Sequence, residues 1–143
     1  MNKEIMRILL VLWLFTSTVF ATESNVEESF DKAQVTFVSA AQQFDGSWCF
    51  KVSVRHNDED WEHYADGWDI LDASHNILWE KTLTHPHVYE QPFTRRLCDI
   101  KIPPKIQKLV VRAKCNRHSY GDKTITVDLT NPKGIGYEVK RFD

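Results

Sequence analysis

Apolar and polar residues alternate with a period of two along several short stretches of the chain. The clearest case lies between positions 47 and 55, where Trp48, Phe50, Val52 and Val54 are separated by polar or small residues. This period places the apolar side chains on one face of a β-strand and the others on the opposite face. No stretch of useful length shows the helical period, so the pattern predicts an all-β protein.

The same criterion predicts seven strands joined by turns and polar loops. In the first strand we expect Val35 and Phe37 to share one face, and Pro103-Pro104 must lie outside the sheet because proline cannot donate to it. The predicted strands cover residues 34–40, 47–55, 67–72, 77–84, 93–100, 106–114 and 123–129.

Seven short strands in about 100 residues predict a seven-stranded antiparallel β-sandwich of the immunoglobulin or fibronectin type III kind. Strands 34–40, 47–55 and 93–100 would form one sheet, and the other four strands would form the second. An eight-stranded barrel is the alternative fold.

The first residues have the pattern of a signal peptide. Lys3 and Arg7 precede a short apolar run, and Val19-Phe20-Ala21 fits a peptidase site, so we expect cleavage after Ala21. The run is too short to span a bilayer, and no cysteine follows it for lipid attachment. We therefore expect a signal peptide over 1–21, a flexible leader over 22–33, the sandwich over 34–130 and a C-terminal tail over 131–143. The mature protein would be periplasmic or secreted, without membrane insertion.

Composition excludes some function classes. The formal net charge is −2, and no basic stripe is present, which argues against nucleic-acid binding. No nucleophile elbow, zinc-protease helix or phosphate loop occurs, so an enzyme is not the favoured reading, although Asp58, Asp60 and Asp66 could do acid–base work.

The histidines are concentrated in alternate loops. In a sandwich of this type such loops lie at the same end. Five of the six histidines would therefore meet there, and only His75 would lie at the other end. The five are His56, His63, His85, His87 and His118.

This grouping suggests a metal site. Residues two apart in extended chain face the same side, and Pro86 keeps the chain extended, so His85 and His87 could grip one ion. A third imidazole from His63, His118 or His56 would complete a site suited to copper or zinc. A carboxylate from Asp58, Asp66 or Glu90 could orient the imidazoles.

Two other interpretations remain open. The histidines could be hydrogen-bonding anchors that tie the loops together. Alternatively, the same end could be a non-metal interaction module that docks a protein, peptide or glycan. For a metal-binding protein, the expected partner is a metal-trafficking or envelope protein. The aromatic candidates for contact are Trp61, Tyr64, Tyr89 and Tyr120.

The three cysteines allow one disulfide within the chain. Cys49 begins one strand and Cys98 ends its antiparallel neighbour, so a cross-strand bond between them is feasible. Cys115 would then be the free thiol at the histidine end. It is either a metal ligand together with His118 or a buried, inert thiol.

Four segments resemble a family of small exported proteins of Gram-negative bacteria. They are His56-Asn57-Asp58, Trp61-Glu62-His63-Tyr64-Ala65-Asp66-Gly67-Trp68, His85-Pro86-His87-Val88-Tyr89-Glu90-Gln91-Pro92-Phe93-Thr94-Arg95, and His118-Ser119-Tyr120-Gly121. The resemblance implies an exported sandwich whose distinctive residues lie in these loops, and it implies no activity.

Overall fold

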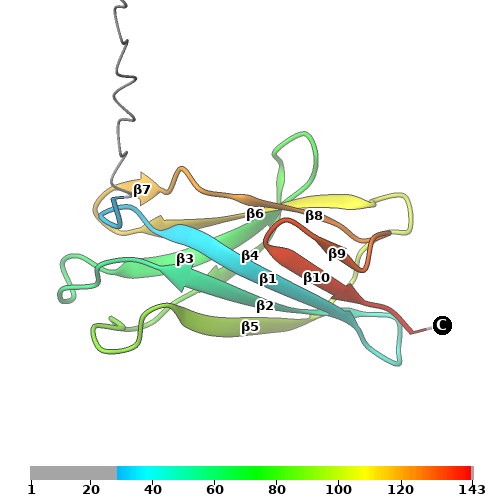
Figure 1. Ribbon diagram of the computed structural model, residues 1–143, viewed down its shortest axis with the longest axis horizontal. Helices are drawn as coiled ribbons and strands as arrows, with labels where there is room; N and C mark the ends of the chain where they lie inside the picture. Colours follow the sequence, from blue (N-terminus) through cyan, green and yellow to red (C-terminus); the bar gives the residue numbers. More distant parts are fainter. Residues whose placement is uncertain (1–28, 143) are drawn as a thin grey trace, which may run out of the picture.

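The computed structural model describes residues 29–142, which form two facing β-sheets without a helix (Figure 1). One sheet has the strand order β5-β2-β1-β10-β9, and the other has the order β4-β3-β6-β7 with β8 also paired to β6. The strands are β1 (Gln34–Gln42), β2 (Trp48–Arg55), β3 (Ala65–Leu71), β4 (Ile77–Thr82), β5 (Phe93–Ile100), β6 (Lys108–Cys115), β7 (Ser119–Tyr120), β8 (Ile125–Asp128), β9 (Lys133–Gly134) and β10 (Tyr137–Lys140).

The predicted all-β, two-sheet architecture is confirmed, and the barrel alternative is wrong because the strands form two sheets. Each of the seven predicted strands has a counterpart, and β1, β2 and β5 share one sheet while β3, β4, β6 and β8 share the other, as expected. The described chain has ten strands rather than seven. Three short ones, β7, β9 and β10, have too few residues for a period of two to stand out.

The segment assigned to a C-terminal tail contains β9 and β10, and β10 pairs in parallel with β1. The expected signal peptide over 1–21 and most of the leader over 22–33 lie outside the described residues. Among residues 29–142, none belongs to a helix that is long and apolar enough to cross a membrane.

A β-bulge in β1 changes which side chains face the core. The register with β2 shifts between Val35 and Phe37, so Val35, Val38 and Ala40 are buried while Phe37 is 40% exposed. The expectation that Val35 and Phe37 share a face is therefore wrong. A bulge adds one residue to one strand and reverses the alternation beyond it, which a strict period of two cannot show.

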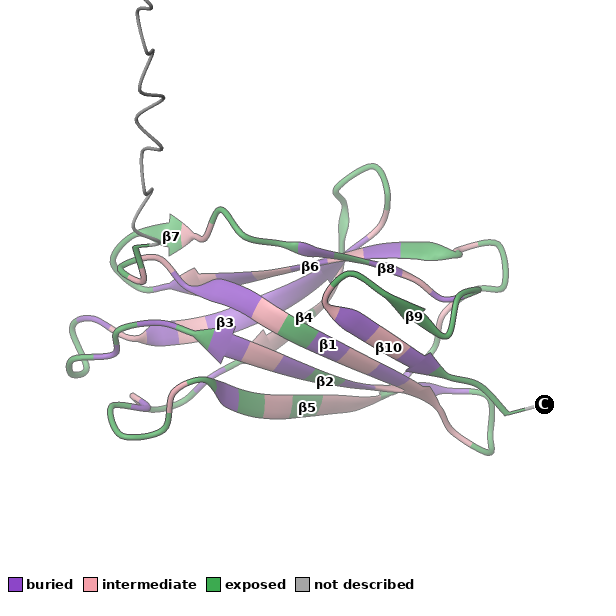
Figure 2. Ribbon diagram, viewed as in Figure 1, coloured by how far each residue is buried: buried purple, intermediate pink, exposed green. Residues whose placement is uncertain are grey.

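The apolar core lies between the sheets (Figure 2). In β2 every second residue is buried, and β6 shows the same alternation, so the inward faces follow the sequence pattern. The largest fully buried side chains in this core are Trp68, Phe50 and Phe93.

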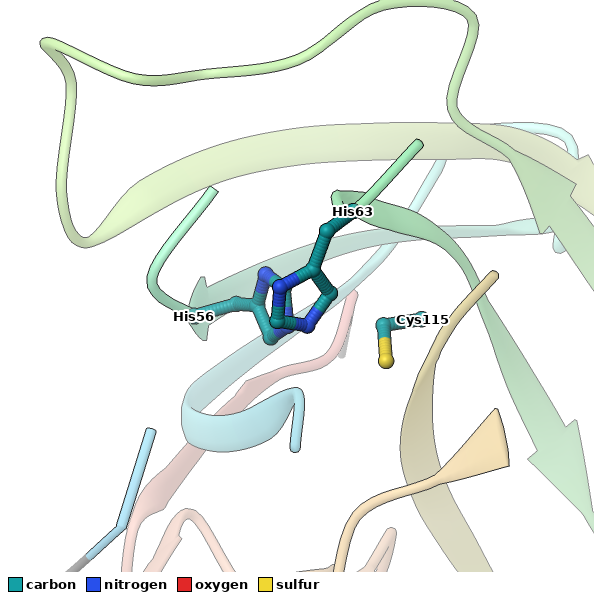
Figure 3. A group of neighbouring side chains, drawn as sticks. All are labelled: His56, His63 and Cys115. Carbon is teal, nitrogen blue, oxygen red and sulfur yellow. The ribbon is translucent and has the colours of Figure 1, made fainter. Parts of the chain in front are cut away.

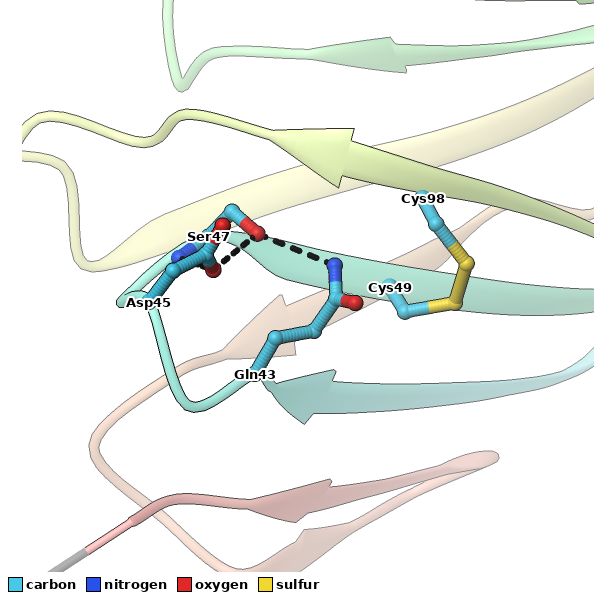
Figure 4. Close-up of a disulfide and its surroundings, with 5 residues drawn as sticks. All are labelled: Gln43, Asp45, Ser47, Cys49 and Cys98. Atoms are coloured by element: carbon cyan, nitrogen blue, oxygen red, sulfur yellow. Dashed lines mark hydrogen bonds between the residues drawn. A yellow bond between two sulfur atoms is a disulfide. The ribbon is translucent and has the colours of Figure 1, made fainter.

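A disulfide joins Cys49 in β2 to Cys98 in β5, the pair expected from the strand positions (Figure 4). It lies near the turn between β1 and β2, where Gln43 Nε2 donates to Ser47 Oγ at 2.9 Å and Ser47 Oγ donates to Asp45 Oδ1 at 2.6 Å. Cys115 is the free cysteine of the described chain, and it is buried.

Candidate functional site

The loops β2–β3, β4–β5 and β6–β7 lie at one end of the sandwich, together with residues 29–33 that lead into β1 (Figure 1). Asn116 ties two of these loops together. Its Nδ2 donates to Trp61 O at 3.0 Å, and Tyr64 N donates to Asn116 Oδ1 at 3.0 Å. The topology therefore brings side chains from distant parts of the sequence into one region.

Two imidazoles and a thiol converge at this end. His56 follows β2, His63 precedes β3, and Cys115 ends β6; Figure 3 shows their side chains together. One ligand atom from each lies within 4.8 Å of the other two, close enough to hold a metal ion. Their exposed fractions are 0%, 3% and 3%, so the group is closed off from solvent.

All three side chains point to one backbone oxygen, that of Asp31. The distances to Asp31 O are 2.9 Å from His56 Nε2, 3.3 Å from His63 Nε2 and 3.7 Å from Cys115 Sγ. The three polar atoms therefore share one backbone oxygen as a neighbour. The segment before β1 is part of this region.

Asp58 contacts the ring nitrogen of His56 that points away from the cluster. Asp58 Oδ1 lies 2.5 Å from His56 Nδ1 and accepts from Ala65 N at 3.0 Å, while Oδ2 accepts from His87 N at 2.6 Å. The carboxylate is buried, which by itself raises its pKa, but the bonds from His56, His87 N and Ala65 N outweigh burial and lower that pKa. Asp58 is therefore ionised, and it fixes the imidazole so that Nε2 points into the cluster.

The two ring nitrogens of His56 both face oxygen acceptors, the Asp58 carboxylate and the Asp31 carbonyl. Asp58 thus holds Nδ1, and Nε2 is directed at the cluster. A metal ion would replace the proton on Nε2 and leave the Nδ1 bond to Asp58 in place. Carboxylate–histidine–metal triads have this arrangement.

His63 and Cys115 have further neighbours. Glu59 Oε1 lies 3.3 Å from His63 Nδ1, within ion-pair distance, although the angles do not make a hydrogen bond. His118 N donates to Cys115 Sγ at 3.1 Å. The sulfur of Cys115 is therefore held between the His118 N–H and the Asp31 carbonyl oxygen.

His85 and His87 lie beside this cluster rather than in it. Their rings are 4.5 Å apart, and His85 Nδ1 lies 3.0 Å from Pro86 O. His87 is buried and stacks on Phe93 at 4.0 Å, and neither of its ring nitrogens has a hydrogen-bond partner in the described part of the chain. Burial and the charges of Arg95 and His85 lower the pKa of His87, so the ring stays neutral. The structure thus brings His56, His63 and Cys115 together, whereas the sequence predicted a site of His85 and His87 with a third imidazole from His63, His118 or His56.

The remaining candidates have other neighbours. Glu90 forms a two-pronged ion pair with Arg95 at 3.2 and 3.1 Å, and this pairing lowers the pKa of Glu90. Burial raises the pKa of Asp66, and its Oδ1 has no hydrogen-bond partner within residues 29–142.

The aromatic candidates are divided between two environments. The Tyr120 ring lies 3.5 Å below the Arg112 guanidinium, on the outer side of β6, where burial and Asp69 raise its pKa. Trp61 packs edge-on against Tyr64 at 5.8 Å and is 65% exposed. Only Trp61 and Tyr64 therefore lie in the loop that carries His63.

The sequence left Cys115 open between a metal ligand together with His118 and a buried, inert thiol, and it did not indicate Asp31. A cysteine at the end of a strand that enters the histidine loops was the available signal for Cys115. A backbone carbonyl leaves no signal in the sequence.

Comparison with known proteins adds one relative. Over 98 residues the chain is 33% identical to a protein of Halomicrobium mukohataei named "Putative lipoprotein", and the match covers 66% of this chain and 48% of that protein. The chain thus spans about half the length of this curated relative. No family model matches the chain, and no solved structure matches it.

Proposed function

We propose that this protein is an exported β-sandwich that binds a transition metal, copper or zinc, through His56 Nε2, His63 Nε2 and Cys115 Sγ. The observation that carries the proposal is the convergence of these three buried donors on one point, with Asp58 holding His56 in place. Buried imidazole and thiol groups gathered in this way are typical of metal sites.

The three ligand atoms lie within 4.8 Å of one another, so they would move closer together to bind one ion. Metal–nitrogen bonds of about 2.1 Å and metal–sulfur bonds of about 2.3 Å place tetrahedral ligands about 3.4–3.8 Å from each other. The distances from Asp31 O to His63 Nε2 and Cys115 Sγ, 3.3 and 3.7 Å, are close to this range. The carbonyl oxygen of Asp31 is therefore suited to be a fourth, weaker ligand.

The chemical nature of the ligand atoms determines which class of metal ion the proposed site binds. A thiolate with two imidazoles suits zinc and copper, whereas calcium and magnesium prefer oxygen ligands. Two imidazoles, one thiolate and a weak axial oxygen also match the ligand set of mononuclear copper sites that transfer electrons. We propose binding or delivery of the ion, with an envelope protein as partner, because nothing in the cluster places a substrate.

The exported location is supported by the name of the Halomicrobium relative, which describes an envelope-associated protein, and by the disulfide between Cys49 and Cys98. Disulfides persist in oxidising compartments and are rare elsewhere. We propose a periplasmic or secreted location, and an immunoglobulin-like topology in which β1, β2 and β5 face β3, β4, β6 and β8.

The test is metal binding by tag-free protein in competition with a chelator of known affinity. We expect stoichiometric binding of copper(II) or zinc that is lost in His56→Ala and in Cys115→Ser. A His75→Asn variant, changed at the opposite end of the sandwich, should bind as the wild type does. Binding no tighter than micromolar, or binding unaffected in both cluster variants, would contradict the proposal.

A second candidate function is a metal-free interaction module. Trp61 and Tyr89 are 65% and 102% exposed at the same end of the molecule, so they are available to a protein, peptide or glycan. In that case Trp61→Ala and Tyr89→Ala would abolish capture of the partner, while changes to the buried cluster would act only on stability.

A further inference from the structure

The three side-chain ligands of the proposed metal site are all buried. His56, His63 and Cys115 expose between 0% and 3% of their surface, and Asp31 O lies between them. An ion from solvent therefore meets a more exposed neighbour before it meets these buried donors. The exposed side chains next to the ligands are the candidates for this first contact with the ion.

His118 is the exposed histidine that contacts the cluster directly. Its ring lies 5.0 Å from the ring of His63 in an edge-to-face arrangement. Its backbone N–H donates to Cys115 Sγ at 3.1 Å. His118 therefore contacts two of the three ligand residues while its own side chain is open to solvent.

We propose that His118 is the exchange ligand through which a metal ion enters and leaves the buried site. This inference rests on the proposed function. The incoming ion binds a ring nitrogen of His118 and gives up one water or donor ligand. It then passes to His63 Nε2 and Cys115 Sγ, where the thiol proton is lost to solvent and a metal–sulfur bond replaces the S–H bond. His56 Nε2 completes the set, its proton is lost to solvent as the metal–nitrogen bond forms, and the His118 ring is released.

Two other groups are alternatives for this entry route. Glu59 Oε1 lies 3.3 Å from His63 Nδ1, but this nitrogen is not the one that faces the cluster. The second alternative is the pair His85 and His87. Asp58 separates this pair from the ligands: its Oδ2 accepts from His87 N, and its Oδ1 faces His56 Nδ1, the nitrogen that points away from the cluster. His87 is itself buried and stacked on Phe93. An ion at His85 would have to pass both Asp58 and the His56 ring, so this route is longer and is blocked by a hydrogen-bonded carboxylate.

The experiment is stopped-flow loading of the metal-free protein with copper(II) and with zinc, followed by removal of the ion with excess chelator. We compare wild type with His118→Ala and His85→Ala, which change exposed histidines on the two candidate routes, and with His75→Asn at the far end. For His118→Ala we expect loading and release to slow by about tenfold or more, with the equilibrium affinity changed by less than about threefold, since an exchange ligand lowers the barrier in both directions. The other two variants should load at the wild-type rate.

The outcomes separate this inference from the function on which it rests. If wild type does not bind metal at all, the proposed function fails before any rate is measured. If wild type binds but His118→Ala loads at the wild-type rate, or if only His85→Ala is slow, the role of His118 is overturned. A large loss of equilibrium affinity in His118→Ala would also overturn it, because His118 would then be a permanent ligand.

Discussion

The contribution of Asp58 can be tested with Asp58→Asn, which keeps the shape of the side chain and removes its charge. Asp58 accepts three hydrogen bonds with two oxygens, from His56 and Ala65 on Oδ1 and from His87 N on Oδ2. An asparagine has one carbonyl oxygen. If that oxygen keeps the first pair of partners, its NH₂ group faces the His87 N–H, and one buried donor is left without an acceptor.

The size of the effect follows from these contacts. One buried, unsatisfied donor costs about 1–3 kcal/mol of folding free energy. Loss of the carboxylate that orients a metal-binding histidine weakens metal affinity by about 10- to 100-fold, equivalent to about 1.4–2.7 kcal/mol. We therefore expect both losses in the same variant: lower stability of the metal-free protein and weaker metal binding.

Urea unfolding of the metal-free protein gives the first quantity, and chelator competition at neutral pH gives the second. Glu59→Gln is the matched control, because Glu59 Oε1 lies 3.3 Å from Nδ1 of the other imidazole but its side chain is 60% exposed. Solvent screens such a pair, so we expect a change of about 0–1 kcal/mol at most. Metal affinity equal to wild type in Asp58→Asn, or an equal loss in Glu59→Gln, would refute the role assigned to Asp58.

Three further predictions concern the surroundings of the site. The pKa of His87 is lowered in the folded protein, so below about pH 6.5 the unfolded chain takes up a proton first and wild type loses stability. His87→Phe should remove this loss. An unchanged pH dependence of the urea midpoint in the variant would contradict the prediction. Removing the disulfide with Cys49→Ala/Cys98→Ala should lower the unfolding free energy by about 4 kcal/mol for a sequence separation of 49, and urea melts matching oxidised wild type would count against it. Gly121→Ala should weaken metal binding, since a Cβ would overlap Ala33 O and displace the segment that carries Asp31. Gly46→Ala is the control for backbone strain alone, because a Cβ there meets no other atom but φ is +84°. Equal metal affinities in the two variants would argue against the effect.

The strands with strong alternation were predictable from sequence because burial on one face requires a period of two. Strand β2 is the best example, since Trp48, Phe50, Val52 and Val54 are all buried. The bulge in β1 was not predictable, because one inserted residue leaves no compositional mark. Strand β10 was not predictable either, because it has only four residues and its partner β1 is far away in the sequence.

The end of the molecule that carries the site was also predictable, because the order of strands decides which loops meet. The donor set within that end was not. His56 and His63 approach each other because the loop between them turns at Asp60, whose Oδ1 accepts from Glu62 N and His63 N. The spacing of His85 and His87 was the stronger pattern in sequence, but it takes no account of the Asp58 contacts that place His87 beside Phe93.

The most direct test of the metal site is copper(II) titration of metal-free protein, followed by its visible absorption spectrum. A ligand set that includes Cys115 predicts an intense thiolate-to-copper charge-transfer band that saturates at one ion per chain. The band should be absent in Cys115→Ser and should persist in His85→Ala. A wild-type protein that shows no such band, or a band that survives in Cys115→Ser, would contradict the proposed metal site.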